Sequence, residues 1–217
     1  KRNLALVTEK ATHRTNPIAL ENVESWTGRF VSTETEFQGD GVAFESGDLL
    51  FGKLRPYLAK ALLATAAGEA IGDFHVMRPG LEINPRFAQY YLLNHGFIHV
   101  VDGSTYGAKM PRASWSFVAS MAMATPPVEE QDAIADYLDR VTIRIDTLIA
   151  RKTRFIELLR EKRQALITRA VTKGLDDSVP MKDSGVEWLG EVPEHWDVCK
   201  LNYRYSVELG KMLDTKH

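Results

Sequence analysis

The chain has 217 residues, about one and a half typical domains, so its length excludes a large multidomain enzyme and predicts one complete globular unit plus a smaller part. Hydrophobic residues make up 44% and charged residues 26% of the chain, which is typical of a folded protein and excludes a largely disordered one. The net charge of −2 gives no general sign of a nucleic-acid partner, so any such interaction must depend on where the basic residues lie.

Cysteine usage and hydropathy indicate the compartment. The single cysteine, Cys199, cannot form an intrachain disulfide or a thiolate metal site, which fits a reducing environment. No stretch reaches the roughly 18 apolar residues that a transmembrane helix requires, and residues 1–10 lack the apolar core of a signal peptide. We therefore expect a cytoplasmic protein with no membrane partner.

Residues 1–126 show a mixed pattern of short elements. Asn84 is expected to be the N-cap of a helix that runs to Asn94, with Gly96 just beyond its end. Strand-length apolar runs, separated by turn residues, occur at 42–44, 49–51, 58–63 and 74–77. These patterns predict an α+β domain in which at least one helix packs on a sheet of short strands.

From Glu129 to Lys173 the sequence contains neither Gly nor Pro, and apolar residues recur at alternating steps of four and three. This heptad pattern predicts a helix of about 45 residues, roughly 65 to 70 Å long. A domain of about 125 residues cannot cover such a helix, so its apolar seam requires a partner helix. The predicted seam residues are Ile134, Leu138, Val141, Ile145, Leu148, Phe155, Leu159 and Leu166.

Charge is distributed unevenly along this predicted helix. Residues 129–146 contain six acidic and two basic side chains, a net of −4, whereas residues 151–173 contain eight basic and two acidic ones, a net of +6. Acidic residues first and basic residues last suit the helix dipole, which is one explanation. The other explanation is a docking surface, because the basic excess is larger than the last turn of a helix needs.

Gly174 is expected to end the helix, and residues 175–182 have the composition of a turn or linker. A new packed element is expected at 188–196. Either the tail folds back on the first domain, or the chain as given stops inside a second one. The predicted parts are a domain at 1–126, a spacer helix at 127–175, and a linker with the start of a second recognition unit at 176–217.

We find no sequence signature of a catalytic or metal site. A P-loop, a G-x-S-x-G turn, an H-E-x-x-H motif and a cysteine pair are all missing from the sequence. Carboxylates such as Asp73 do not belong to the acid-x-Lys triplet of a metal-dependent nuclease, and isolated histidines such as His75 are more typical of structural positions. We therefore assign no catalytic residue and no metal ligand.

The segment 51–60 alternates basic and aromatic residues with apolar ones, and Pro56 is expected to hold it extended. On an extended strand Lys53, Arg55 and Tyr57 would share one face. Basic groups neutralise phosphates, and an arginine can read guanine through two hydrogen bonds. The alternative is a strand face that is simply exposed to solvent. When this motif is considered alone, the solvent-exposed face is favoured over DNA binding.

The loop 103–112 is a second candidate. Its two glycines allow the backbone to approach a ligand closely, and Ser104 and Thr105 offer hydroxyl groups to phosphate. Lys109 and Arg112 add positive charge with no acidic residue between them. The pattern fits a loop that binds a polyanion, and it fits a glycine-rich surface turn equally well.

Three segments together resemble the specificity subunit of type I restriction-modification systems. They are 47–57 (GDLLFGKLRPY), 103–112 (GSTYGAKMPR) and 126–139 (PPVEEQDAIADYLD), and their order and spacing cover nearly the whole chain. Residues 159–167 (LREKRQALI) resemble the conserved helix of that family, and 184–196 resembles the entry into its next target recognition domain. Each motif is weak alone, but the combination is specific.

In that family, two target recognition domains that each read half of a split DNA site are separated by long helices in an antiparallel coiled coil. The resemblance implies an antiparallel partner for the seam and a docking surface for modification subunits, which carry S-adenosylmethionine and methyl transfer. It implies no catalysis and no cofactor in this chain. Because the chain has one recognition domain, we expect a fragment or a half-sized subunit that dimerises with a second copy.

The residues and the resemblance together predict an α+β target recognition domain that binds double-stranded DNA, followed by a long coiled-coil helix that docks modification subunits, with the restriction subunit as a further partner. Ser104 and Thr105 would position phosphates. The predicted DNA-binding residues are Lys53, Arg55, Tyr57, Ser104, Thr105, Tyr106, Lys109 and Arg112. The alternative is a protein interaction scaffold in which the coiled coil is the functional part and the first domain only caps it.

Overall fold

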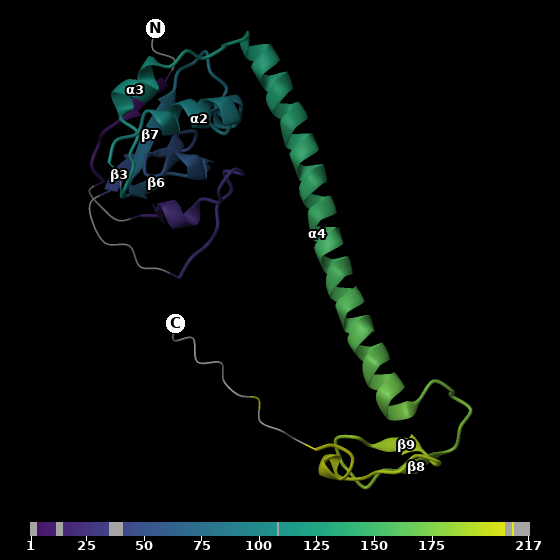
Figure 1. The fold of residues 1–217 in the computed structure, drawn as a ribbon. Coiled ribbons are helices and arrows are strands. Elements are labelled where there is room, and N and C mark those ends of the chain that lie inside the picture. Colours follow the sequence, from purple (N-terminus) through teal and green to yellow (C-terminus); the bar gives the residue numbers. More distant parts are fainter. Residues whose placement is uncertain (1–3, 12–14, 35–40, 108, 207–209, 211–217) are drawn as a thin grey trace. The chain divides into compact units, whose positions relative to one another are not determined.

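The computed structural model describes residues 4–11, 15–34, 41–107, 109–206 and 210, and Figure 1 shows their secondary structure. The contacts within the chain divide it into two compact units, Lys1–Arg144 and Ile145–His217. The boundary between the units falls inside the longest helix, and each unit is described by itself below.

The first unit combines short strands with helices, which confirms the predicted α+β class. Its strands are β1 (Leu4–Val7), β2 (Pro17–Ile18), β3 (Gly41–Phe44), β4 (Leu49–Gly52), β5 (Ala61–Leu63), β6 (Gly68–Ile71) and β7 (Phe74–Pro79). Its helices are the 3-10 turns η1 (Leu20–Asn22) and η2 (Pro56–Leu58), the helices α1 (Pro85–Leu92), α2 (His95–Gly103) and α3 (Trp115–Ser120), and the start of α4 (Val128–Lys173).

The strands form two sheets. One is antiparallel with the order β1-β7-β4-β5, and the other has the order β2-β6-β3 with β2 parallel to β6. In the first sheet the inner strand β4 is buried along its whole length. Because successive side chains of a strand point to opposite faces, β4 must be covered on both sides.

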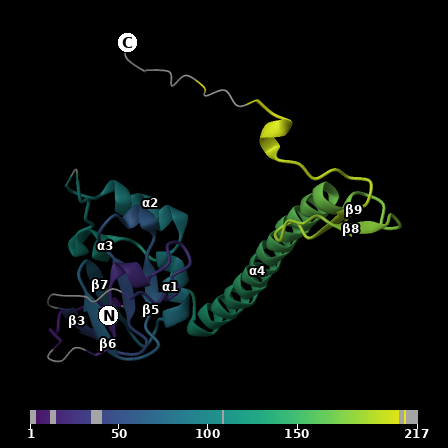
Figure 2. The same cartoon turned by 90° about the horizontal axis from the view of Figure 1, so that it is seen from below.

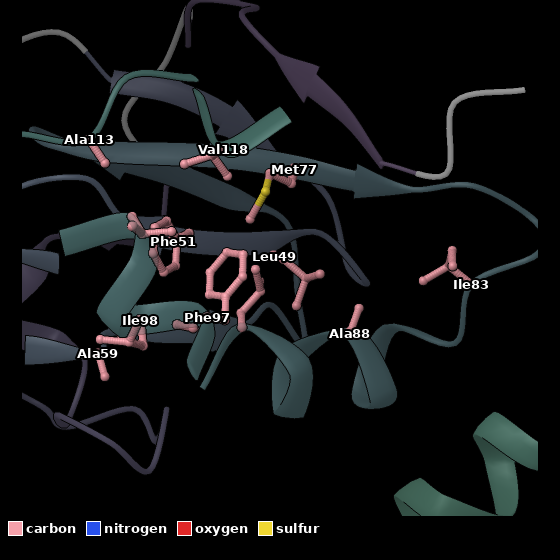
Figure 3. Close-up of a cluster of buried hydrophobic side chains, with 13 residues drawn as sticks. Leu49, Phe51, Ala59, Met77, Ile83, Ala88, Phe97, Ile98, Ala113 and Val118 are labelled. Atoms are coloured by element: carbon pink, nitrogen blue, oxygen red, sulfur yellow. The ribbon is translucent and has the colours of Figure 1, made fainter. Parts of the chain in front are cut away.

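Two apolar clusters provide that cover. One joins Leu49 of β4 to residues of the three short α-helices, among them Phe97 of α2, and is drawn in Figure 3. The other joins Leu50 of β4 to residues of the second sheet, among them Ala70 of β6. Figure 2 shows α2 and β6 on opposite sides of β7. The first unit therefore has three layers: helices, the four-stranded sheet and the three-stranded sheet.

The strand predicted for residues 53–57 is wrong. Arg55 adopts a left-handed backbone conformation, and Pro56 begins the 3-10 turn η2, in which the N–H of Leu58 donates to the carbonyl of Arg55 at 2.9 Å. The fixed φ of proline suits the first turn of a helix as well as an extended chain, and the tertiary contacts select the turn. For the same reason the strand expected at 58–63 is shortened to β5.

Helix α1 begins as predicted but ends earlier. The side chain of Asn84 caps it by accepting a hydrogen bond from the N–H of Phe87 at 3.0 Å. The helix ends at Leu92, and Asn94, expected to be its last residue, instead caps α2 by accepting from the N–H of Gly96 at 2.8 Å. Gly96 was predicted to lie just beyond the end of this helix, but it lies in the first turn of a second helix, α2.

Helix α4 confirms the long helix predicted from the heptad pattern. It spans Val128–Lys173, 46 residues in all. Gly174 follows with φ +79°, a conformation that favours glycine, and ends the helix as predicted. Within the described ranges, no helix is both long enough and apolar enough to cross a lipid bilayer.

The second unit contains the remainder of α4 and a small hairpin. Strand β8 (Met181–Asp183) pairs antiparallel with β9 (Glu191–Pro193), and the 3-10 turn η3 (Leu201–Tyr203) follows. Val192 is buried, whereas Trp188 is 83% exposed. The division of the chain at residues 126 and 175, and the assignment of 176–217 to a second recognition unit, stay predictions.

Candidate nucleic-acid interface

The two basic segments predicted to bind DNA lie side by side in the first unit. The N–H of Arg55 donates to the carbonyl of Pro111 at 2.8 Å, and the N–H of Ala113 donates to the carbonyl of Lys53 at 2.9 Å. These hydrogen bonds join the segment after β4 to the loop between α2 and α3. Two motifs that are far apart in the sequence therefore contribute to one surface.

The loop between α2 and α3 also folds back on itself. Tyr106 and Arg112 exchange two backbone hydrogen bonds of 3.3 and 3.1 Å, and Arg112 forms a second bridge with Leu54. Gly107 has φ +93°, which a glycine adopts at no steric cost. Ala108 lies outside the described residues. The backbone of Arg112 is thus held between two neighbouring segments.

Arg55 has an unusual backbone conformation, with φ +51° and ψ +64°. A left-handed conformation costs a residue other than glycine about 1 to 3 kcal/mol, and such strain is concentrated at functional sites. The N–H and the carbonyl of Arg55 are both hydrogen-bonded, as described above, and they hold the strained conformation. The side chain is exposed and forms no ion pair with any described residue.

Asp73, which immediately precedes β7, connects two of the predicted basic residues. Nε of Arg112 donates to Oδ1 of Asp73 at 3.0 Å, and Nη2 donates to Oδ2 at 2.9 Å. Nζ of Lys53 lies 3.9 Å from the same carboxylate. The hydrogen bonds to Asp73 raise the pKa of Arg112, so the guanidinium keeps its charge. In the sequence Asp73 stands out only as a carboxylate that could bind a metal ion, and no local pattern indicates its role beside two basic residues.

The hydroxyl groups of Ser104 and Thr105 have other partners in the structure. Oγ of Ser104 donates to the carbonyl of Val101 at 2.7 Å, and Oγ1 of Thr105 donates to the carbonyl of Asp102 at 2.8 Å. Both hydroxyl groups therefore add to the backbone hydrogen bonds at the end of α2, in which the N–H groups of Ser104 and Thr105 donate to the same two carbonyls. Their predicted role as phosphate donors stays a prediction, and it requires these hydrogen bonds to change.

The remaining predicted residues are Tyr57, which was expected to share a strand face with Lys53 and Arg55 but does not, and Tyr106 and Lys109 of the loop. Tyr57 lies within η2 and is 46% exposed, while Tyr106 is 63% exposed. Lys109 is also exposed and, like Arg55, forms no ion pair with a described residue. The two segments thus carry two cations without an ion pair among the described residues, Arg55 and Lys109, and two exposed phenol rings. The other two predicted cations, Lys53 and Arg112, are paired with Asp73.

His75 lies under this surface and has a structural role. Its Nε2 is 3.0 Å from the carbonyl oxygen of Ala113, and its ring packs 5.6 Å from the ring of Trp115. Burial lowers the pKa of His75, which keeps the imidazole neutral. In the described part of the chain, no three His, Cys, Asp or Glu side chains gather closely enough to hold a metal ion.

The start of α4 is attached to the first unit by Gln131. Its side chain is fully buried and accepts a hydrogen bond from the N–H of Asn84 at 2.9 Å. It also donates to the carbonyls of Glu82 at 3.0 Å and Pro126 at 2.8 Å. Gln131 therefore satisfies the backbone at the N-cap of α1, a role that a glutamine within the same helix often takes.

Charged residues extend this contact along α1. Arg86 pairs with Asp136 at 2.8 Å and with Asp139 at 2.7 Å, and the hydroxyl of Tyr90 donates to Asp139 at 2.7 Å. The hydrogen bond to Asp139 raises the pKa of Arg86. Two of the acidic residues in the first half of α4 are thus used to attach the helix to its own domain.

The predicted seam lies on a different face of α4. At about 100° per residue, the buried positions 131 and 135 are centred roughly 90° from the seam. The first seam residues, Ile134, Leu138 and Val141, are half-buried within the first unit. The later ones are exposed, at 48% for Ile145, 46% for Leu148, 60% for Phe155, 49% for Leu159 and 57% for Leu166.

Several curated proteins are similar to this chain, although no protein-family model matches it. They include the type I restriction enzyme EcoDI specificity subunit of Escherichia coli, 23% identical over 158 residues, and the MjaVIII specificity subunit of Methanocaldococcus jannaschii, 30% identical over 107 residues. These matches cover 70% and 49% of this chain but only 35% and 24% of the relatives. The chain thus spans about a third or less of their length.

Solved structures show the same fold. The HsdS subunit from Thermoanaerobacter tengcongensis gives a TM-score of 0.53, and a chain from work on complex assembly and conformational transition of the type I R-M system gives 0.55. Both are 19% identical to this chain, and the match covers 78% of it and 47% of each structure. The curated relatives therefore confirm the resemblance to type I specificity subunits, and the solved structures confirm the predicted fold class.

Proposed function

We propose that the first unit is a target recognition domain that binds duplex DNA through the surface formed by the two basic segments. The observation that carries the proposal is the hydrogen-bonded junction between the Arg55 segment and the Arg112 loop. Lys53 and Arg112 meet there at the carboxylate of Asp73, and the same two segments carry Arg55 and Lys109. DNA-binding residues in this proposal are Lys53, Arg55, Tyr57, Ser104, Thr105, Tyr106, Lys109 and Arg112.

Electrostatics supports this surface even though the chain has a net charge of −2. Cationic side chains that approach phosphates displace the counterions of DNA, and this release favours binding in proportion to the number of contacts. Arg55 and Lys109 are exposed and unpaired among the described residues, so they are suited to phosphates. The phenol rings of Tyr57 and Tyr106 offer hydroxyl donors at the same surface.

The relatives support a role in recognition, because those named above are specificity subunits of restriction enzymes. We therefore assign to this chain the reading of one half of a bipartite site, without a catalytic centre or cofactor of its own. S-adenosylmethionine and the methyl transfer reaction belong to a modification subunit in this proposal. Such a complex acts on DNA in the cytoplasm.

Helix α4 has a separate role in the proposal, which is to pair with an antiparallel helix and to dock modification subunits, with the restriction subunit as a further partner of the complex. Apolar seam side chains from Ile145 to Leu166 are about half exposed, so a partner helix would remove them from water. The acidic half of α4, residues 129–146, and its basic half, residues 151–173, would face each other in an antiparallel pair with a second copy.

A binding titration tests the DNA-binding proposal. Lys109→Ala combined with Arg112→Ala should weaken affinity for duplex DNA at least tenfold and flatten its salt dependence, because two cations of the proposed surface are lost. The matched control is Arg140→Ala with Arg144→Ala, which removes two charges from exposed positions of α4. Equal losses in the two double variants would show that only net charge matters and would contradict the proposed surface.

The exposed seam also favours a second candidate function, a coiled-coil interaction scaffold without sequence-specific DNA binding. A competition experiment separates the two functions. A scaffold would retain its protein partner and bind a labelled duplex no better than it binds an uncharged polymer. A recognition domain would bind the duplex in preference to that polymer and would enrich particular sequences from a random pool.

A further inference from the structure

We infer that Asp73 determines part of the DNA specificity by fixing the guanidinium of Arg112 so that its free edge reads a guanine in the major groove. The inference rests on the proposed DNA-binding function and assigns a substrate group to one residue of that site. Arg112 is then a base-reading residue, whereas Arg55 and Lys109 contact phosphates. Asp73 acts through Arg112 and is a positioning residue.

The geometry of the ion pair leaves the correct edge of Arg112 free. A guanidinium has five N–H donors, and the carboxylate of Asp73 occupies one on Nε and one on Nη2, at 3.0 and 2.9 Å. The adjacent, end-on edge retains a parallel pair of donors, one on Nη1 and the second N–H of Nη2. No described residue accepts a hydrogen bond from Nη1. This end-on pair matches the O6 and N7 acceptors of guanine.

Both partners of the ion pair are held by the backbone around them. The carbonyl of Asp73 accepts a hydrogen bond from the N–H of Lys53 at 2.8 Å, and the next residue, Phe74, is buried at the start of β7. On the other side, Arg112 exchanges two backbone hydrogen bonds with Tyr106. The guanidinium plane is therefore oriented before DNA arrives, which lowers the entropy cost of ordering it on binding.

Charge favours a base contact over a phosphate contact for this arginine. The carboxylate of Asp73 lies against Arg112 and within 3.9 Å of Lys53, so it weakens the attraction of both cations for phosphate. A residue needed only for phosphate binding would gain affinity if this carboxylate were absent. The retained ion pair contributes orientation, and orientation matters for reading the edge of a base.

Selection from a random duplex pool tests the inference with the full chain. The wild-type protein should enrich a motif that contains a G·C pair. Asp73→Asn should reduce the preference for that pair about tenfold while binding to unselected duplex stays equal or becomes tighter, because a negative charge is removed. Asp102→Asn is the matched control: it removes the same charge beside the same loop, and its side chain forms no hydrogen bond or ion pair with Arg112, so it should keep the preference.

A change in the DNA provides a readout that does not depend on the folding of a variant. Replacing the selected guanine by 7-deazaguanine removes the N7 acceptor and should weaken wild-type binding about tenfold. Inosine keeps O6 and N7 and should bind normally. In Asp73→Asn the 7-deazaguanine effect should shrink, because the guanidinium is no longer aligned.

The outcomes distinguish the inference from the function on which it rests. If the wild-type chain enriches no motif, the proposed recognition function fails. If it enriches a motif, but Asp73→Asn selects the same sequence with the same discrimination and 7-deazaguanine has no effect, the inference is overturned while the recognition function stands. A uniform gain in affinity without a change in motif would show that Arg112 contacts phosphate.

Discussion

Gln131 joins the start of α4 to the recognition domain, and Gln131→Leu tests that junction. The buried side chain makes three hydrogen bonds to the backbone, to Asn84 at 2.9 Å, Glu82 at 3.0 Å and Pro126 at 2.8 Å. Leucine has a similar volume but no polar atom. The substitution therefore removes the partner of one N–H group and two carbonyl groups without leaving a large cavity.

The expected loss follows from these three groups. A buried backbone group without a partner costs about 1 to 3 kcal/mol. Glu82 is exposed and Pro126 and Asn84 are half-buried, so water reaches part of the site and the lower value applies to each group. We expect the free energy of unfolding of the first unit to fall by about 3 kcal/mol, a large fraction of the roughly 5 to 15 kcal/mol of a typical domain.

Hydrogen exchange of the slowest amides of β4 and β7 measures this free energy in the first unit alone. We expect exchange to be about a hundredfold faster in Gln131→Leu, since 1.36 kcal/mol corresponds to a factor of ten. Gln131→Glu keeps the shape but turns an anionic oxygen toward two carbonyls, so it should be at least as destabilising. Gln164→Leu is the matched control at an exposed position of the same helix. If both leucine variants exchanged at equal rates, the reasoning would be refuted.

Three further predictions address the seam, the strained loop and a buried histidine. Leu148→Asp should abolish self-association or helix pairing in sedimentation experiments, whereas Ala150→Asp, on the opposite side of the helix, should leave the mass unchanged. Arg55→Gly should weaken DNA binding without lowering the melting temperature, because glycine adopts the left-handed conformation freely; a large loss of stability would contradict this. Because burial lowers the pKa of His75, the unfolded chain binds the extra proton, so stability should fall as pH drops below about 6.5. Thermal melts of His75→Gln should show a weaker pH dependence, and an unchanged profile would argue against this origin.

The parts of the fold that local signals control could be predicted from the sequence. Asn84 followed by Pro85 specifies the start of α1 through a cap and a proline in the first turn, and both are present in the structure. Helix α4 could be predicted because its heptad pattern continues without Gly or Pro from Glu129 to Lys173. The left-handed Gly174 ends that helix for a reason that concerns only its own backbone.

Other parts depend on contacts between distant segments and could not be predicted. The alternating pattern of residues 53–57 suggested a strand, but the hydrogen bond from Arg55 to Pro111 and the buried Pro56 impose a turn. A glycine such as Gly96 commonly marks the end of a helix when the sequence is considered locally. In the structure the side chain of Asn94 caps a new helix, α2, which begins at this point. In both places the tertiary structure overrides a weak local preference.

The candidate site shows the same division. Basic and aromatic residue types identified the two segments, because phosphate and base contacts require them. Their convergence, however, depends on the path of the chain through β4, β7 and the loop after α2. The ion pair between Asp73 and Arg112 joins residues 39 positions apart, and no sequence pattern indicates it.

The most direct test of the account is a photocrosslinking map of the chain on its selected duplex. A photoreactive phenylalanine analogue at position 106, which is paired with Arg112 through the backbone, should crosslink to DNA. Competing unlabelled duplex should remove the signal. The same group at position 81, where Leu81 is fully exposed in the same unit, should give no crosslink. Equal crosslinking from both positions, or crosslinking from position 81 alone, would contradict the proposed recognition surface.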